Sequence, residues 1–163
     1  MPLWLHLSIH AALAILSGWM VGRAFGRPLL GILAGFLSGF LIDLDHVIEY
    51  FFTFGLSFNL RYFFEARHFL ISDQARIIFH AWEYILPLAA GLVIFRRYQK
   101  VAACLAAFLL AMVVHLASDC LINHYPPQYY SLAYRHQVNY QLSSLLSPEQ
   151  YQENQELKAK LEI

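Results

Sequence analysis

Four stretches of the chain are apolar over about 20 residues, which is the length of a membrane-spanning helix. Short basic turns join the first stretch to the second and the third to the fourth, and in Gly26-Arg27-Pro28 the proline is well placed to begin a helix. The expected spans cover residues 3–21, 29–54, 75–95 and 101–122. The pattern predicts an all-α polytopic membrane protein with about four transmembrane helices in an up-down bundle.

Two other segments have a different pattern. Between residues 60 and 71, apolar side chains fall on one helix face and polar ones on the other, which predicts a helix lying in the membrane interface. The tail contains Ser147-Pro148-Glu149-Gln150, a capping-box start that predicts a short polar helix. We therefore expect an integral membrane domain over residues 1–146 and a polar helical tail over residues 147–163.

The second span contains a stripe of small residues. Gly31, Gly35 and Gly39 recur every four residues along it. Such a stripe allows a neighbouring helix to approach closely. An equally simple interpretation is that the glycines have no packing role, because membrane helices tolerate glycine.

The composition supports a membrane location. Hydrophobic residues make up 59% of the chain and charged residues 13%, against roughly 45–50% and 25% in ordinary soluble proteins. The 11 basic and 11 acidic residues balance to a formal net charge of zero, so nothing indicates binding to nucleic acid.

Polar residues interrupt the four spans at one depth. Counted from the basic turns, each span brings an imidazole or a carboxylate after about 13 to 16 residues. These residues are His10, Asp43, His80 and His115. In an up-down bundle they form one layer about 20–24 Å from the basic side. Because charge inside a membrane is costly unless it is paired or bound to a cation, this layer is a candidate functional site.

The spacing of the polar residues favours a metal site. His115 and Asp119 share a helix face, as do His6 and His10, although His6 alone is more simply a helix-to-helix hydrogen-bonding residue. Asp43 and Asp45 diverge by about 200° on a regular helix, so both serve one site only if the helix ends or distorts there. Mixed imidazole and carboxylate ligands from several elements are typical of metal sites that activate water.

These motifs resemble those of the LexA-regulated, membrane-bound metal-dependent hydrolases. The resemblance consists of a histidine in the first span, Asp43-Leu44-Asp45-His46 ending the second, His80 in the third, and a His-Leu-x-x-Asp motif in the fourth. The family is found in bacterial inner membranes and is often set beside zinc-dependent phospholipase C. The resemblance implies a divalent metal, zinc, as one or two ions. The implied metal ligands are His10, Asp43, Asp45, His80, His115 and Asp119.

The sequence differs from the family pattern at two of these motifs. Ile42 stands where the family usually has proline, and Ile77-Ile78-Phe79-His80-Ala81-Trp82-Glu83 replaces its Arg-Gly-x-Thr-His-Ser signature. The second departure affects the expected substrate contacts. Glu83 is a candidate proton acceptor, metal ligand or orienting carboxylate, and Asp45 is a candidate catalytic residue as well as a ligand.

Three classes of function remain open on these residues. The first is a metal-dependent hydrolase that acts at the membrane surface on a lipid or another amphiphile. Arg67, on the expected interfacial helix, is then a candidate contact for the headgroup of the substrate. The second is a haem-binding electron-transfer bundle, and the third a metal or proton transporter or a non-catalytic scaffold. The first span has no basic residue before it and Arg23 and Arg27 after it, which favours termini outside the cytoplasm.

Overall fold

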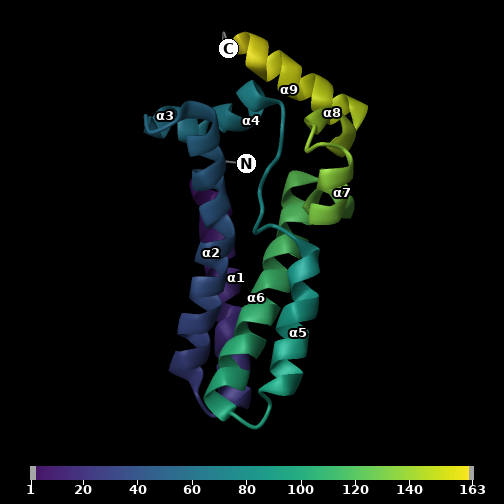
Figure 1. Cartoon of the computed structure of the whole chain (residues 1–163). Helices are drawn as coiled ribbons and strands as arrows, with labels where there is room; N and C mark the ends of the chain where they lie inside the picture. The colour runs from purple at the N-terminus through teal and green to yellow at the C-terminus, as the bar shows by residue number, and fades with distance from the viewer. Residues whose placement is uncertain (1–2, 162–163) are drawn as a thin grey trace. The chain divides into compact units, whose positions relative to one another are not determined.

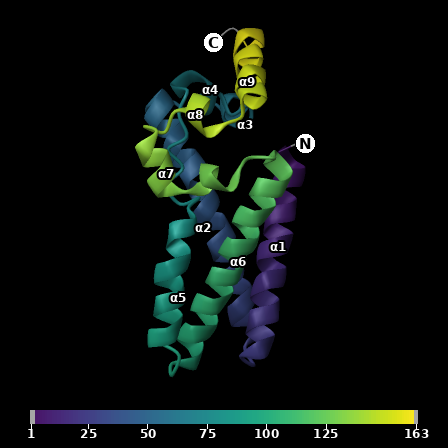
Figure 2. The same ribbon diagram turned by 90° about the vertical axis from the view of Figure 1, so that its right-hand side faces the viewer.

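The computed structural model describes residues 3–161, and this range is built from helices (Figure 1 and Figure 2). The elements are α1 (Leu3–Ala24), α2 (Pro28–Phe54), α3 (Leu60–Phe64), α4 (Arg67–Ser72), the 3-10 helix η1 (Trp82–Tyr84), α5 (Ile85–Ile94), α6 (Gln99–Asn123), the 3-10 helix η2 (Pro127–Tyr130), α7 (Leu132–Gln137), α8 (Leu142–Leu145) and α9 (Pro148–Lys160). Residues 3–161 contain no β-strand, and Gln74 and Gln141 form an isolated antiparallel bridge. The all-α prediction is confirmed.

Three of these helices are long and apolar enough to cross a membrane. They cover Leu5–Ala24 in α1, Pro28–Phe54 in α2 and Gln99–Asn123 in α6. The first, second and fourth expected spans therefore correspond to real helices, and their bounds differ from the expected ones by a few residues. Their length and composition are compatible with a membrane location.

The third expected span, over residues 75–95, is helical only in its second part. The apolar helical segment there is Trp82–Ile94, which combines η1 and α5. At 1.5 Å per residue it is about 20 Å long, shorter than a hydrocarbon core of about 30 Å. Pro87 lies in the first turn of α5, where its missing N–H costs no helix hydrogen bond. The expected helix start at Ala75 is corrected to Trp82.

The expected interfacial helix over residues 60–71 is also different, because two short helices, α3 and α4, replace it. Ala66 between them has a φ of 51°, in the left-handed region that interrupts a right-handed helix. As a result α4 turns another face inward. His68, expected on the polar face, is buried beside the rings of Tyr50 and Phe63. The expected single amphipathic helix is thus corrected to two short helices joined by a turn.

The chain divides into two compact units. Unit 1 contains Met1–Asp43 and Trp82–His124, and unit 2 contains Leu44–Ala81 and Tyr125–Ile163. Unit 1 holds α1, the first part of α2, η1, α5 and α6. Unit 2 holds the rest of α2 and the helices α3, α4, η2, α7, α8 and α9. Each unit is described separately below.

In unit 1, α1 and α2 meet backbone to backbone through small residues. A side chain at Gly31 would overlap the backbone of Gly18, and one at Gly35 would overlap the backbone of Ala14. At Gly39 an added Cβ would meet only the methyl group of Ala14, at 3.1 Å. The first two glycines of the stripe therefore allow the close approach that the sequence pattern predicts.

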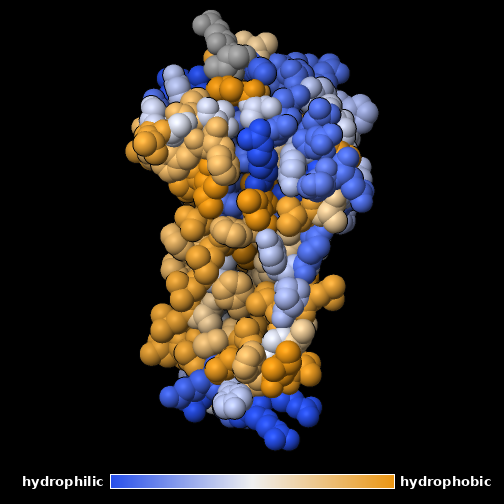
Figure 3. Space-filling model, in the orientation of Figure 1, coloured by the Kyte–Doolittle hydropathy of each residue, from blue (hydrophilic) through white to orange (hydrophobic). Residues whose placement is uncertain are grey.

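The outer surface of unit 1 is apolar along its helices. Figure 3 shows hydrophobic residues over this surface and hydrophilic residues at the turns that join α1 to α2 and α5 to α6. The exposed apolar side chains include Leu16, Leu29, Leu33, Leu37, Val93 and Ile94. The basic residues of the turns are Arg23, Arg27, Arg96, Arg97 and Lys100. An apolar belt that ends at basic turns is the distribution expected of helices in a bilayer.

Unit 2 contains a non-helical segment, residues 74–81, whose backbone polar groups are bonded by other parts of the unit. The guanidinium of Arg135, which is fully buried, donates hydrogen bonds to the carbonyl oxygens of Ile77 and His80. The Ala75 N–H donates to the Tyr140 carbonyl oxygen at 2.9 Å. These bonds replace those that a helix would supply, which a buried backbone requires.

The expected polar helix in the tail is present as α9. Both halves of the capping box are formed, because the Ser147 hydroxyl accepts from the Gln150 N–H and the Gln150 side chain accepts from the Ser147 N–H. The Tyr151 hydroxyl also donates to the Asp73 carboxylate at 3.0 Å. This prediction is confirmed.

Candidate metal centre

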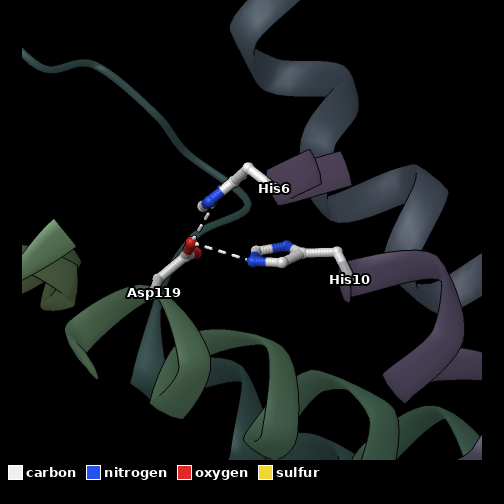
Figure 4. Close-up of side chains that lie close together, drawn as sticks. All are labelled: His6, His10 and Asp119. Carbon is white, nitrogen blue, oxygen red and sulfur yellow. Dashed lines mark ion pairs between the residues drawn. The ribbon is translucent and has the colours of Figure 1, made fainter. Parts of the chain in front are cut away.

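Five imidazole and carboxylate side chains of unit 1 meet near the end of its helices opposite the basic turns. They are His6 and His10 on α1, Asp43 on α2, and His115 and Asp119 on α6. Figure 4 shows the two α1 histidines pointing toward Asp119 from across the helix interface. Because α1 and α6 run in opposite directions, the first turns of α1 lie beside the last turns of α6. The sequence places the polar residues at these two ends, so packing brings them together.

The Asp119 carboxylate lies at the middle of the cluster. Its Oδ1 atom is 3.4 Å from His6 Nε2 and 3.3 Å from His10 Nε2. Its Oδ2 atom is 3.4 Å from His115 Nε2. Asp43 Oδ1 also lies 3.4 Å from that nitrogen. Three helices thus direct nitrogen and oxygen donors toward common points.

The histidines also contact one another. His10 Nδ1 lies 3.1 Å from both ring nitrogens of His115, and the two ring centroids are 4.0 Å apart. The Ser118 hydroxyl donates to the His115 carbonyl oxygen at 2.8 Å and lies 3.3 Å from His10 Nε2.

Burial differs across the cluster. The side chains of His10 and His115 are each 2% exposed and that of Asp119 is 4% exposed, whereas His6 is 18% and Asp43 26% exposed. A buried carboxylate is costly unless it is paired or coordinates a cation. The cluster therefore has a closed interior and two accessible members.

The donor set can hold a metal ion. Two overlapping groups, His6 with His10 and Asp119, and His10 with Asp43 and His115, each have ligand atoms within 4.8 Å of one another. Bonds of 2.0–2.1 Å around a tetrahedral Zn²⁺ separate its ligands by about 3.3–3.4 Å. The four imidazole–carboxylate distances are 3.3–3.4 Å, longer than an ordinary N–H···O hydrogen bond. Both the donors and their spacing fit a divalent cation.

Four of the predicted ligands therefore lie together: His10, Asp43, His115 and Asp119. His6 joins them, although the sequence favoured a hydrogen-bonding role for it. The signal was its position one helical turn before His10, which places both imidazoles on one face of α1.

Asp45 and His80 lie in unit 2 and contact each other. The Asp45 carboxylate accepts hydrogen bonds from the N–H groups of Phe79 at 2.8 Å and His80 at 3.1 Å, and its Oδ1 is 3.0 Å from His80 Nδ1. The His46 ring lies 4.8 Å from that of His80. Since α2 remains helical through this region, Asp43 and Asp45 point in different directions, as their spacing requires. Their shared role as ligands stays a prediction.

The other two predicted functional residues are Glu83 and Arg67. Glu83 is half-buried in η1 and is not a member of the candidate groups found among the described residues. Arg67, in unit 2, is almost buried; its Nε atom donates to Glu65 at 2.6 Å and its guanidinium lies 4.3 Å from the centre of the Tyr62 ring. A headgroup contact by Arg67 would compete with these interactions.

Comparison of the chain with protein-family models, with curated proteins and with solved structures finds no match.

Proposed function

We propose that this protein is a membrane-embedded, metal-dependent hydrolase that acts on an amphiphile with a phosphoester or similar polar head. The observation that carries the proposal is the cluster of three histidines and two aspartates among apolar helices, in which His10, His115 and Asp119 are buried. Zn²⁺ and similar ions prefer these donors. When bound, such an ion supplies Lewis acidity, which polarises a phosphoryl oxygen and activates water.

The exposure of the cluster indicates where a substrate approaches. His10 and His115 close the interior, while Asp43 and His6 remain in part accessible. Asp43 is thus positioned to face a reacting group, and His10 and His115 keep bulk water from the far side. Because exposed apolar residues cover the surrounding helices, a molecule with hydrocarbon tails can approach without leaving an apolar environment.

Other residues keep the roles proposed from the sequence. Glu83 is a candidate proton acceptor, since it lies in unit 1 and is half-buried. Asp45 and His80 remain candidate ligands, and Arg67 a candidate headgroup contact. The order of the motifs supports membership of the LexA-regulated, membrane-bound metal-dependent hydrolases, with zinc as the metal and a bacterial inner membrane as the location.

The orientation is part of the proposal. The basic turns of unit 1 favour the cytoplasmic side, which puts both termini and the cluster near the opposite leaflet. A cysteine introduced in place of Tyr98, in the turn before α6, should resist labelling by an impermeant reagent added to intact cells. Efficient labelling would reverse the orientation.

The geometry disfavours haem between the two most buried histidines. Two axial ligands lie on opposite sides of a haem iron, whereas His10 Nδ1 is 3.1 Å from the ring nitrogens of His115. A haem between them would require the rings to separate. A metal-ion site requires no such change.

The test is hydrolysis in mixed micelles with a panel of phospholipids and lipid pyrophosphates, with and without a chelator. We expect cleavage that the chelator stops and that Asp119→Ala lowers at least about 100-fold, because Asp119 contacts three histidines of the cluster. The control is His136→Ala, which replaces an exposed histidine of unit 2 and should leave the rate unchanged. Cleavage of water-soluble esters alone, at one rate in all three proteins, would contradict the proposal.

A further inference from the structure

The basic residues of unit 1 lie in or beside the two turns that join α1 to α2 and α5 to α6, and both turns are at the same end of the unit (Figure 1 and Figure 2). These basic residues are Arg23, Arg27, Arg96, Arg97 and Lys100. The acidic residues of the unit are Asp43, Glu83 and Asp119. The nearest of them in sequence, Glu83, stands 13 residues before Arg96, which is about 20 Å along a helix. Unit 1 therefore has a basic end without acidic residues.

The basic side chains at this end have no counter-ion within the chain. All of them are exposed, and among residues 3–161 no carboxylate forms an ion pair with any of them. The guanidinium of Arg23 lies 5.4 Å from the centre of the Trp19 ring, which adds no negative charge. By contrast, Arg61 and Arg67 of unit 2 pair with Glu65 at 2.8 Å and 2.6 Å. The basic end therefore attracts an anion from outside the chain.

Apolar side chains border the basic end. Met20 on α1 is 54% exposed, Leu29 on α2 is 68% exposed and Ile94 on α5 is 70% exposed. Each of them lies within three residues of a basic residue. Trp19 and Tyr98 are also exposed there, and these two residue types favour the headgroup level of a membrane. A ligand that matches this surface carries a negative charge next to hydrocarbon.

We infer that the basic end of unit 1 binds anionic phospholipids of the leaflet around it. The phosphate oxygens accept hydrogen bonds from the arginine guanidiniums, whose paired N–H groups match phosphate geometry. The acyl chains lie along the exposed apolar side chains of α2 and α5. Because the metal cluster is at the opposite end of unit 1, this inference does not rest on the proposed function.

Charge complementarity favours this occupant over two others. A zwitterionic phospholipid carries its own cation, which the basic side chains repel. A soluble phosphate supplies the negative charge but no hydrocarbon for the apolar border. Basic clusters beside a membrane span attract anionic lipids with a free energy that increases with the number of basic residues. A lipid with a net negative headgroup is therefore the ligand that uses both parts of the surface.

The experiment titrates the detergent-solubilised full chain with dioleoylphosphatidylglycerol or dioleoylphosphatidylcholine, which have the same acyl chains and differ in net charge. Native mass spectrometry measures the lipid bound per chain, and a chelator is present so that metal-dependent hydrolysis does not consume the lipid. We expect the anionic lipid to bind at least about tenfold more tightly, since several basic residues contribute. Glycerol 3-phosphate, which carries the phosphate without acyl chains, should not compete.

Paired substitutions test where the lipid binds. Arg96→Gln/Arg97→Gln and Arg23→Gln/Arg27→Gln should each lower the preference for the anionic lipid about fivefold, whereas Arg96→Lys/Arg97→Lys should keep most of it. The matched control is Lys158→Gln/Lys160→Gln, which removes two basic residues from α9 in unit 2 and should leave the preference unchanged. Circular dichroism and the elution position show whether each variant keeps its fold.

Equal binding of the two lipids by the wild-type protein, a comparison that needs no variant to fold, would overturn the inference. A loss of preference in the α9 control as large as that in Arg96→Gln/Arg97→Gln would also overturn it, because net charge alone would then account for the binding. Competition by glycerol 3-phosphate at the concentration of the lipid would show that the surface takes a free phosphate anion and not a lipid. Each of these results would leave the hydrolase proposal standing.

Discussion

Replacement of Asp45 by alanine removes the carboxylate that holds the non-helical segment of unit 2. Asp45 is 1% exposed and accepts hydrogen bonds from the N–H groups of Phe79 and His80. It also pairs with the ring of His80, which is 2% exposed. Buried backbone N–H groups in folded proteins nearly always have a hydrogen-bond partner, and the carboxylate is the partner of both of these.

The cost follows from the number of donors left without an acceptor. Each buried N–H that loses its acceptor costs about 1–3 kcal/mol, so two backbone donors alone cost about 2–6 kcal/mol. If about 3 kcal/mol of this appears as easier local opening, amide exchange in the segment accelerates roughly 100-fold, at tenfold per 1.4 kcal/mol. Asn at position 45 keeps one acceptor oxygen and should cause a smaller increase, of roughly tenfold.

Hydrogen exchange followed by mass spectrometry on peptides that cover residues 75–82 measures the effect. The control is Glu153→Gln, which changes an exposed carboxylate on α9 of the same unit and should leave exchange there unchanged. If Phe79 and His80 exchange no faster in Asp45→Ala than in the control, the carboxylate does not hold this backbone.

Two further predictions concern packing and pH. Gly31→Ala should destabilise the protein by about 1–3 kcal/mol through overpacking of α1 against α2, whereas Gly91→Ala, whose Cβ would meet Leu105 at an ordinary 3.5 Å, should not; equal melting temperatures in detergent would refute the close contact. Burial, with a smaller contribution from His46, lowers the pKa of His68 to about 3. Because the unfolded chain then binds the proton more readily, stability should fall as the pH drops from about 6.5 toward 3. His68→Phe should flatten this dependence, and an unchanged slope in the variant would contradict the assignment.

The sequence is sufficient for the long helices and for most of the unit 1 cluster. Unbroken apolar runs bounded by Arg27, Lys100 and similar residues determine where α1, α2 and α6 begin and end. Since helical rise is constant, residues at equal distance from the turns reach equal depth, and His10, Asp43 and His115 are brought together for that reason. The sequence is less informative about His6, because one imidazole on a membrane helix can serve several roles until its partner, Asp119, is placed.

The sequence is less informative about residues 74–81, where side chains accept or donate the hydrogen bonds that the backbone of a helix would otherwise form with itself. Ile77, Ile78 and Phe79 make the stretch before α5 as apolar as a membrane helix, so hydropathy predicts a span there. The segment is instead held by buried side chains distant in sequence, among them Arg135, and no local pattern reveals such long-range bonds. Pro87 was the available signal, because a proline is best tolerated in the first turn of a helix.

X-ray absorption at the zinc edge of the purified, Zn²⁺-loaded protein tests the central claim most directly, because it reports the ligands themselves. The account predicts a first shell of nitrogen and oxygen at about 2.0–2.1 Å, with the outer-shell scattering of imidazole, which should weaken in His115→Ala. A first shell with sulfur at about 2.3 Å, supplied by Cys104 or Cys120, both free thiols, would contradict it. So would a shell of water oxygens without imidazole.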